Sequence, residues 1–339
     1  MIDPIISEDI KNISANLDVS IFKDEKMLIT GGAGFLGSYL CDLFVNLGSH
    51  VTCLDNFSTS TLGNIDHLIK TKNFRLLRDD VSKINIKETF NYIFHFSSRA
   101  SPEDYQLHPV ETLITNSVGS HEILKLAVKG GSRILFASTS EIYGDPQVIP
   151  TPEDYWGNVN PIGVRSCYDE GKRFGEALFM AYYREYDLDM RIVRIHNTYG
   201  PRIRSDGNYA RALPRFINQA LKGEDITVYG DGSQTRSFCY ISDTIRGVIA
   251  AISNNKATGE VFNIGNPREI SILELAEKIK GSIHSASEIV FQPLPEDDPK
   301  RRKPSIEKAR KKLKWQPDIS LENGLKRTIE WFKFTNQNL

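Results

Sequence analysis

Short apolar runs alternate with longer amphipathic stretches through most of the chain. The runs at residues 26–30, 50–54, 74–77, 92–96, 133–136 and 191–195 are short and largely hydrophobic, which predicts buried strands. The stretches at residues 38–47 and 109–129 carry apolar residues at helical spacing. Strands that alternate with helices predict right-handed crossovers. The expected fold class is therefore α/β, a doubly wound parallel sheet.

Some segments lie outside this alternation. Residues 1–23 carry isoleucines at roughly helical spacing, which predicts a short helix packed on the body of the protein. In the second half, residues 272–279 and 306–331 show helical patterns. The expected units are an N-terminal extension at residues 1–23, a sheet domain at 24–200 with a return segment at about 237–265, and a smaller α/β lobe mainly at 201–339.

A glycine-rich turn joins the first predicted strand to the first helix. Gly31, Gly34 and Gly37 have the spacing GxxGxxG, and the second strand ends at Asp55. Glycines let the backbone approach a pyrophosphate at the helix N-terminus, and they let helix and strand pack closely. An acid after the second strand can accept a hydrogen bond from a ribose 2′-hydroxyl and repels a 2′-phosphate. The pattern predicts a dinucleotide site that prefers NAD to NADP.

Polar residues follow further strands, at the edge of the sheet where ligands bind in folds of this class. Asp80 comes after the third strand and could contact the adenine, and Ser97 and Ser98 follow the fourth strand. The fifth strand runs into Ser138-Thr139-Ser140-Glu141. That sequence places hydroxyls and a carboxylate at the same cleft.

A tyrosine and a lysine form the candidate base. Tyr168 and Lys172 are four residues apart, so on a helix they share one face and the ammonium can lie beside the phenol. A phenol titrates near pH 10, so a base at neutral pH needs a pKa lower by roughly three units, or about 4 kcal/mol. A neighbouring lysine cation can supply much of that shift. The same spacing also occurs by chance on exposed helices.

Composition and charge limit the expected partners. The chain has 42 lysines and arginines against 43 aspartates and glutamates, so no nucleic-acid or membrane surface is expected. Its 4 cysteines are widely spaced without metal-like clustering, which predicts reduced structural thiols and no metal site. The sequence has no long apolar span and no basic start followed by an apolar core, so we expect a cytoplasmic protein.

Several longer motifs carry a family resemblance. They are Gly31 to Gly37, Ala137-Ser138-Thr139-Ser140-Glu141, Glu153-Asp154-Tyr155-Trp156-Gly157, Asn160-Pro161-Ile162-Gly163, Cys167-Tyr168-Asp169-Glu170-Gly171-Lys172, Asn197-Thr198-Tyr199-Gly200-Pro201-Arg202, Gly232-Ser233-Gln234-Thr235-Arg236, Asp297-Asp298-Pro299 and Arg302-Lys303-Pro304. Over about residues 25–333 the chain resembles the extended short-chain dehydrogenase/reductases that act on nucleotide sugars, and among them the UDP-glucuronate decarboxylase (UDP-xylose synthase) family. This resemblance implies a Rossmann sheet, an NAD cofactor, a UDP-sugar substrate and a homodimer formed through helices that include that of Tyr168.

The family resemblance also implies a chemical course. Hydride passes from the sugar C4 to NAD, with Tyr168 as the base on the 4-hydroxyl and Lys172 lowering its pKa. Thr139 or Ser138 orders the same hydroxyl. The resulting 4-keto uronic acid loses CO2, C5 takes up a proton, and the hydride returns to C4, so the cofactor is recycled.

Other residues distinguish this reaction from its relatives. A nucleotide-sugar 4,6-dehydratase carries Asp-Glu where this chain has Ser140 and Glu141, and a simple 4-epimerase tends to lack the glutamate. The pair therefore favours decarboxylation, with Glu141 handling protons or water near C5. Arg302 is the residue implied to reach the sugar carboxylate, although the adjacent Arg301 leaves the assignment open by one position.

The resemblance supplies the remaining site residues. For the cofactor these are Gly31, Gly34, Phe35, Leu36, Gly37, Asp55, Asn56, Asp80, Val81, Ser97, Ser98, Ser138, Tyr168, Lys172 and His196. For the substrate they are Asn197, Arg211, Tyr229, Gln234, Arg236 and Arg302. Asn197 is expected at the diphosphate or sugar, Arg211 and Arg236 at the diphosphate, and Tyr229 with Gln234 at the uracil and ribose.

Some positions depart from the family pattern. His196 stands where the family usually has a phenylalanine beside the nicotinamide, and Ser97-Ser98-Arg99 replaces an alanine-rich stretch. The loop from Arg202 to Arg215 is longer than in the decarboxylases. These departures leave the nucleotide base and the exact sugar open. The alternatives are a nucleotide-sugar 4-epimerase or 4,6-dehydratase, and a non-catalytic NAD-binding scaffold, which would need neither Tyr168 nor Glu141.

Overall fold

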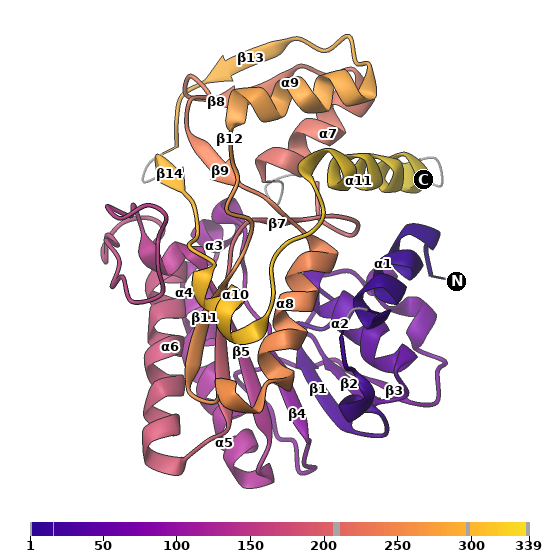
Figure 1. Cartoon of the computed structure of the whole chain (residues 1–339), viewed down its shortest axis with the longest axis vertical. Coiled ribbons are helices and arrows are strands. Elements are labelled where there is room, and N and C mark those ends of the chain that lie inside the picture. Colours follow the sequence, from indigo (N-terminus) through magenta and orange to yellow (C-terminus); the bar gives the residue numbers. More distant parts are fainter. Residues whose placement is uncertain (1, 16, 206–210, 296–298, 337–339) are drawn as a thin grey trace.

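The computed structural model describes residues 2–15, 17–205, 211–295 and 299–336. Its central strands are β1 (Lys26–Thr30), β2 (His50–Leu54), β3 (Phe74–Leu77), β4 (Tyr92–His95), β5 (Arg133–Thr139), β6 (Met190–Ile195) and β11 (Glu260–Ile264). They form one sheet in the order β11-β6-β5-β4-β1-β2-β3, shown in Figure 1, and every neighbouring pair runs parallel. The predicted doubly wound parallel sheet is confirmed.

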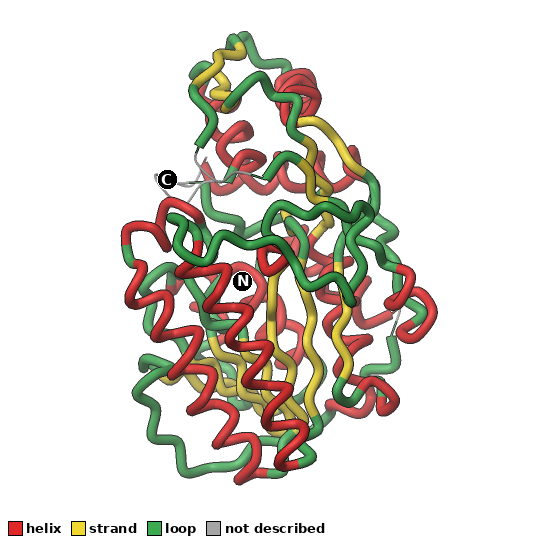
Figure 2. The backbone as a smooth tube through the Cα atoms, turned by 90° about the vertical axis from the view of Figure 1, so that its left-hand side faces the viewer, coloured by secondary structure: helices red, strands yellow, loops and turns green. Residues whose placement is uncertain are grey.

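Burial on both faces explains why the central strands are almost wholly apolar. Along β5, Ile134 and Phe136 pack with one hydrophobic cluster, whereas Leu135 between them packs with another. The first cluster faces α5 (Ser120–Gly130) and α6 (Ser166–Tyr186), and the second faces α2 (Phe35–Asn46) and α8 (Ile241–Ser253). Helices therefore cover both faces of the sheet, as Figures 1 and 2 show.

The helix expected at residues 109–129 is interrupted. It consists of α4 (Pro109–Ile114), a π-helical turn (Thr115–Gly119) and then α5, and a short helix, α3 (Pro102–Leu107), precedes it. These elements and α6 lie side by side in Figure 1.

A second lobe lies above the carboxyl ends of the strands (Figure 1). Its helices are α7 (Ala212–Lys222), α9 (Ile272–Ile283) and α11 (Leu321–Asn336), and its strands are β8 (Ile226–Tyr229), β9 (Thr235–Ser237), β12 (Glu269–Ser271), β13 (Ile289–Gln292) and β14 (Arg301–Arg302). The short strands β7 (Thr198–Tyr199) and β10 (Cys239–Tyr240) pair with each other between the central sheet and the second lobe. The helix α10 (Glu307–Leu313) packs on β11. The chain thus enters this lobe, returns through α8 and β11, and enters the lobe again.

The N-terminal extension contains the expected helix, α1 (Pro4–Ala15). Its buried Asp9 accepts hydrogen bonds from Tyr240 (2.9 Å) and Arg327 (2.9 Å), and a longer one from Tyr39 (3.4 Å). Since these partners come from β10, α11 and α2, the extension ties the sheet domain to the second lobe.

Two parts of the motif pattern fall outside the described residues. They are Asp297 and Asp298 of the Asp297-Asp298-Pro299 motif, and residues 206–210 of the loop between Arg202 and Arg215. Among the helices described, none is both long and apolar enough to cross a membrane.

Candidate active site

Two adjoining cavities lie where the strands of the sheet end. The first has a volume of about 270 Å³ and the second about 220 Å³. Both are lined by Ser101, Asn197, Thr198, Ile203 and Arg211, so the cavities share a wall. The first extends over the glycine turn, and the second reaches into the second lobe toward β9 and β14.

The glycine turn lines the floor of the first cavity. Gly31 has φ +67°, and a Cβ added there would lie 2.9 Å from the backbone of Phe96. A Cβ on Gly37 would lie 2.1 Å from the carbonyl oxygen of Gly31. Only glycine fits at these positions, and the N-terminus of α2 stays open to the cavity, which suits a pyrophosphate.

Asp55 is fixed at the end of β2. Its carboxylate accepts hydrogen bonds from the amides of Ala33 (2.9 Å) and Phe57 (2.9 Å) and from the hydroxyl of Ser60 (2.8 Å). These donors hold the carboxylate at the cavity edge as an acceptor. A ribose hydroxyl fits this acceptor, whereas a phosphate would be repelled.

The cofactor residues expected from the sequence gather around the first cavity. Its lining includes Gly31, Gly34, Phe35, Leu36, Gly37, Asp55, Asn56, Val81, Ser97, Ser98, Ser138, Tyr168, Lys172 and His196. Asp80 is the exception, because its neighbour Asp79 lines the cavity instead. The Asp80 carboxylate accepts hydrogen bonds from Ser82 (2.7 Å) and Asn56 (3.1 Å).

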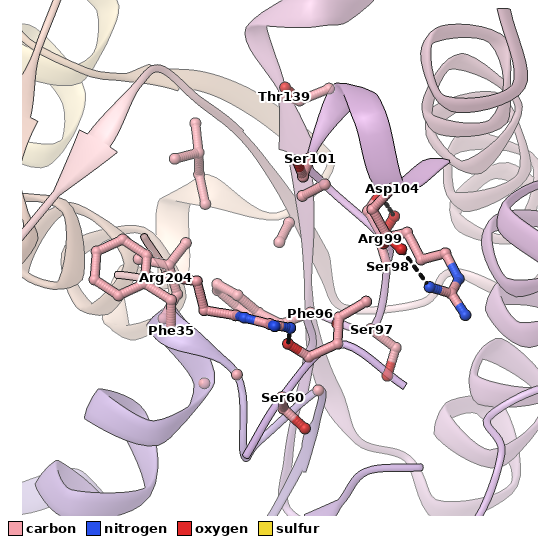
Figure 3. Close-up of a pocket in the computed structure, with 18 of the residues that line it drawn as sticks. Phe35, Ser60, Phe96, Ser97, Ser98, Arg99, Ser101, Asp104, Thr139 and Arg204 are labelled. Atoms are coloured by element: carbon pink, nitrogen blue, oxygen red, sulfur yellow. Dashed lines mark hydrogen bonds and ion pairs between the residues drawn. The ribbon is translucent and has the colours of Figure 1, made fainter. Parts of the chain in front are cut away.

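Figure 3 shows the interior of this cavity. The side chain of Arg204 reaches in beside Phe35 and Phe96, and its Nη1 donates to the Thr59 carbonyl oxygen (2.8 Å). Arg99 turns away from the cavity and pairs with Asp104 (2.7 Å). Arg204 is therefore a cation inside the cofactor cavity that sequence reasoning did not select.

Tyr168 lies on the first turn of α6 and lines the first cavity. Its phenol is hydrogen-bonded to the Thr139 hydroxyl at the end of β5. Burial raises the pKa of Tyr168, the Glu141 carboxylate raises it further, and the Arg211 guanidinium opposes the rise.

Lys172 is buried beside the end of β5. It lines the same cavity as Tyr168, but its ammonium donates to the Ala137 carbonyl oxygen (2.9 Å) and lies over the Phe136 ring. No hydrogen bond joins Lys172 and Tyr168 among the residues described. Burial lowers the pKa of Lys172 to about 7. The helix brings Lys172 and Tyr168 to one cavity, where the Ala137 carbonyl oxygen of β5 accepts the hydrogen bond from the ammonium, and the effect of Lys172 on the phenol stays a prediction.

Glu141 is a buried carboxylate between two arginines. Its Oε2 accepts a hydrogen bond from Arg165 (2.6 Å), and its Oε1 lies 3.4 Å from Arg302 Nη1. Burial opposes ionisation, but the charges of these arginines and of Arg211 lower the pKa of Glu141 to about 2. The carboxylate is thus ionised at neutral pH.

The two candidate arginines at β14 have different surroundings. Arg302 is buried, lines the second cavity and pairs with Glu141. Arg301 is exposed, and its guanidinium pairs with Glu269 (2.7 Å) on the outer side of the same strand. Successive residues of a strand point to opposite sides, so only Arg302 faces the cavity.

The residues expected for the substrate line the second cavity. They are Asn197, Arg211, Tyr229, Gln234, Arg236 and Arg302. The Arg215 guanidinium carbon lies 4.5 Å from the centroid of the Tyr229 ring. Together the two residues give the second cavity an aromatic and a cationic surface. Ser140 is buried, but it is absent from the described lining of both cavities.

His196 follows β6 and is buried at the first cavity. Its Nε2 lies 3.4 Å from Asn263 Oδ1, and its Nδ1 has no hydrogen-bond partner among the described residues. Burial lowers the pKa of His196 to about 3, so the ring is neutral.

Sequence reasoning missed three residues around Glu141. Arg165 donates to it, and the Tyr105 hydroxyl lies 3.4 Å from its Oε2. The carboxyl of Asp169, the residue after Tyr168, also interacts with it. The one available signal was that Arg165 and Asp169 flank Tyr168 within one helical turn, whereas Tyr105 comes from α3 and gives no local signal.

The chain is similar to known proteins in sequence and in fold. Residues 27–265 match the model of the NAD dependent epimerase/dehydratase family. A relative from Danio rerio, UDP-glucuronic acid decarboxylase 1, is 48% identical over 311 residues, which cover 91% of this chain and 73% of that protein.

Two solved structures have a similar fold. UDP-glucose 4-epimerase from Thermotoga maritima, with UDP-glucose, has a TM-score of 0.85 and 31% identity over 92% of this chain and 99% of that one. UDP-glucuronic acid 4-epimerase from Bacillus cereus, in complex with UDP-glucuronic acid and NAD, has a TM-score of 0.83 and 29% identity over 91% of this chain and 99% of that one.

Proposed function

The chain belongs to the NAD-dependent epimerase/dehydratase family, and we propose that its activity is the decarboxylation of UDP-glucuronate to UDP-xylose. The observation that carries this proposal is the pair of Glu141 and Arg302 in the cavity next to Tyr168. A hexuronate brings a carboxylate that needs a cation, and its loss leaves a carbon that needs a proton. Arg302 can supply the cation, and Glu141 can handle protons or water near C5. The 48% identity to a UDP-glucuronic acid decarboxylase supports the same substrate.

NAD is the proposed cofactor, and when bound it accepts a hydride from the sugar and returns it. The glycine turn would hold its pyrophosphate, and Asp55 would hold its adenine-side ribose. Tyr168 would remove the proton of the 4-hydroxyl, with Thr139 hydrogen-bonded to the phenol. The buried Lys172 has a lowered pKa, so a change of its protonation near neutral pH can accompany that transfer.

The second cavity would hold the UDP part of the substrate. Arg211 and Arg236 offer guanidinium groups to the diphosphate. Tyr229 and Gln234 border the end of the cavity that would take the uracil. Arg302, which lies beside Glu141, would then receive the sugar carboxylate. This arrangement orients a nucleotide sugar with its acid group toward Glu141.

A 4-epimerase is the second candidate. The Bacillus cereus structure is a UDP-glucuronic acid 4-epimerase of the same fold, so the substrate alone does not decide the reaction. Decarboxylation is favoured because Glu141 is held as a carboxylate by Arg165 and Arg302 where C5 chemistry is expected. An epimerase needs no acid at that carbon.

Proton NMR of the purified protein with UDP-glucuronate and NAD, together with a CO2 assay, tests this function. We expect UDP-xylose with stoichiometric CO2. UDP-galacturonate without CO2 would mean an epimerase. Glu141→Gln should slow CO2 release more than it weakens UDP-sugar binding, and equal losses of both would contradict its role.

A homodimer is part of the proposal. Val110, Ile114 and Val118 are exposed at four-residue intervals along α4 and the π-helical turn, and Phe174 on α6 is exposed nearby. An apolar stripe on two packed helices suits a second copy of the chain. Sedimentation analysis of wild type and Val110→Glu should give a dimer and a monomer, and a monomeric wild type would exclude this interface.

The proposed compartment is the cytoplasm. Cys41, Cys53, Cys167 and Cys239 are buried and free, which suits a reducing environment. Microscopy of the tagged full chain tests this location, and a signal in an oxidising compartment would contradict it.

A further inference from the structure

A second buried carboxyl group lies against Glu141. Asp169 is 5% exposed and lies one helical turn after Arg165, which donates to Glu141, and its carboxyl interacts with the Glu141 carboxylate. The Oδ1 of Asp169 receives no hydrogen bond from any described group. Two buried ionised carboxylates that lie close together repel each other, so a proton held between them stabilises the pair.

The charges around the two acids decide where that proton is held. Arg165 and Arg302 approach Glu141 directly, and the Arg211 charge acts on it as well. At Asp169, burial and the charge of Glu141 both raise the pKa of the carboxyl. They outweigh the charges of Arg165 and Arg302, and the pKa of Asp169 rises to about 8. Tyr105 and Tyr168 are the other titratable groups facing the pair, and burial raises the pKa of both. The proton therefore belongs to Asp169 at neutral pH.

We propose that Asp169 and Glu141 share one proton and act as a carboxyl pair, in which Asp169 holds the proton that Glu141 passes to the sugar carbon left by CO2. This inference rests on the proposed decarboxylation. Asp169 acts through Glu141 and is a positioning residue. A neutral Asp169 also leaves the arginines in excess over the carboxylates, which favours an anionic substrate.

Every proton and electron pair in this step has a source and a destination. Cleavage of the C5–C6 bond releases CO2, and its electron pair forms an enolate over C5, C4 and O4. C5 then forms a C–H bond with the proton of the pair, an O–H bond of the pair breaks, and the C4 ketone is restored. Both acids are left ionised, and a proton from water restores Asp169 before the next turnover.

Asp169→Asn tests the proposal, because the amide has the size of the protonated acid and can still donate to Glu141. The near-ultraviolet absorbance of the reduced cofactor in a single turnover separates the two halves of the reaction. Its rise reports oxidation at C4, and its decay requires the C5 proton. We expect Asp169→Asn to leave the rise within about twofold and to slow the decay by about 100-fold, in the range of general acid catalysis.

Glu170→Gln is the matched control, since Glu170 is the next residue on α6 and pairs with Arg173 on the outside of the helix (3.4 Å). It should leave both phases unchanged. If Asp169→Asn slows rise and decay equally, the residue is only structural and the proposal fails.

Wild-type enzyme supplies an independent test if the variant does not fold. The decay should slow about tenfold for each pH unit above the titration of the pair, while the rise should not slow. A decay that does not depend on pH would overturn the proposal. If wild type forms no CO2, the proposed function itself has failed, whereas CO2 release with an unaffected decay in Asp169→Asn rejects only the carboxyl pair.

Discussion

The ring of Tyr105 lies parallel to the ring of Tyr168, with centroids 5.0 Å apart and an interplanar angle of 2°. The Tyr105 hydroxyl lies 3.4 Å from Glu141 Oε2. One fully buried aromatic residue therefore contacts both the proposed base and the proposed acid. Because Tyr105 comes from α3, the loop after β4 helps to fix the geometry at the end of β5.

This contact predicts a graded effect at position 105. Tyr105→Leu removes the stacked ring, and aromatic pairs are worth about 0.5–1.5 kcal/mol beyond their buried area, so kcat for UDP-glucuronate should fall roughly 2- to 10-fold. Tyr105→Phe keeps the ring and should lose less. Steady-state kinetics of both variants measure this difference. An equal loss in both would assign the effect to the hydroxyl instead.

Tyr168→Phe should remove turnover without removing NAD. The phenylalanine keeps the ring but has no hydroxyl to take the proton of the 4-hydroxyl, so we expect kcat to fall by at least about 100-fold. NAD affinity, measured by fluorescence titration, should change little because the glycine turn and Asp55 are intact. Turnover at the wild-type rate would eliminate Tyr168 as the base.

Local patterns predicted the parts of the molecule in which neighbours in sequence are neighbours in space. The strand runs and the glycine turn were found because period and spacing are local properties. The four-residue spacing placed Tyr168 and Lys172 on one face of α6. It did not reveal that the Ala137 carbonyl would take the ammonium, since that contact comes from β5.

The cluster around Glu141 could not be derived from spacing. Glu141, Arg165 and Arg302 lie in three elements far apart in the sequence, and burial sets their protonation. For the same reason, the run of basic residues at β14 did not show whether Arg301 or Arg302 faces the cavity. Successive residues of a strand point to opposite sides, so the two arginines could be distinguished once the neighbours of β14 were known.

The two arginines of β14 provide a matched pair of variants. Arg302→Gln should raise KM for UDP-glucuronate and lower kcat, with kcat/KM reduced about 100-fold, because Glu141 and the substrate carboxylate both lose a buried charge partner. Arg301→Gln should stay within about twofold, since Arg301 pairs with Glu269 at the surface. Kinetics with UDP-glucuronate measure both. A larger loss for Arg301→Gln would reverse the assignment.

His196 offers a test of the cofactor side. The sequence resemblance implies a phenylalanine at this position, and a buried neutral histidine with an unpartnered Nδ1 brings a polar atom to the first cavity instead. We expect His196→Phe to hasten hydride return a few-fold, so less reduced cofactor and less 4-keto product are released per UDP-xylose formed. Chromatography of the released products measures this ratio. An increase in released ketone would mean that His196 assists the return.

Asp9 predicts a pH dependence of stability. Burial raises its pKa from 3.8 to about 6, although Arg327 opposes the shift. The folded state therefore holds this proton between about pH 4 and 6 while the unfolded state does not, and stability from this group is present at low pH and lost as pH rises through 6. The loss amounts to about 3 kcal/mol. Asp9→Asn cannot lose that proton, so its unfolding free energy relative to wild type should increase by about this amount between pH 4 and 7 in urea titrations.

Glu8→Gln is the control for this stability prediction. Glu8 is exposed on the same turn of α1 and also pairs with Arg327 (3.0 Å), so it tests the loss of a surface charge near Asp9. An exposed pair contributes at most about 1 kcal/mol, so the difference between Glu8→Gln and wild type should change by no more than that over this range. If both variants respond alike, the pH dependence comes from the charge of Arg327 rather than from the buried carboxyl. If only Asp9→Asn responds, the N-terminal helix is held to the second lobe by a carboxyl whose ionisation costs stability at neutral pH.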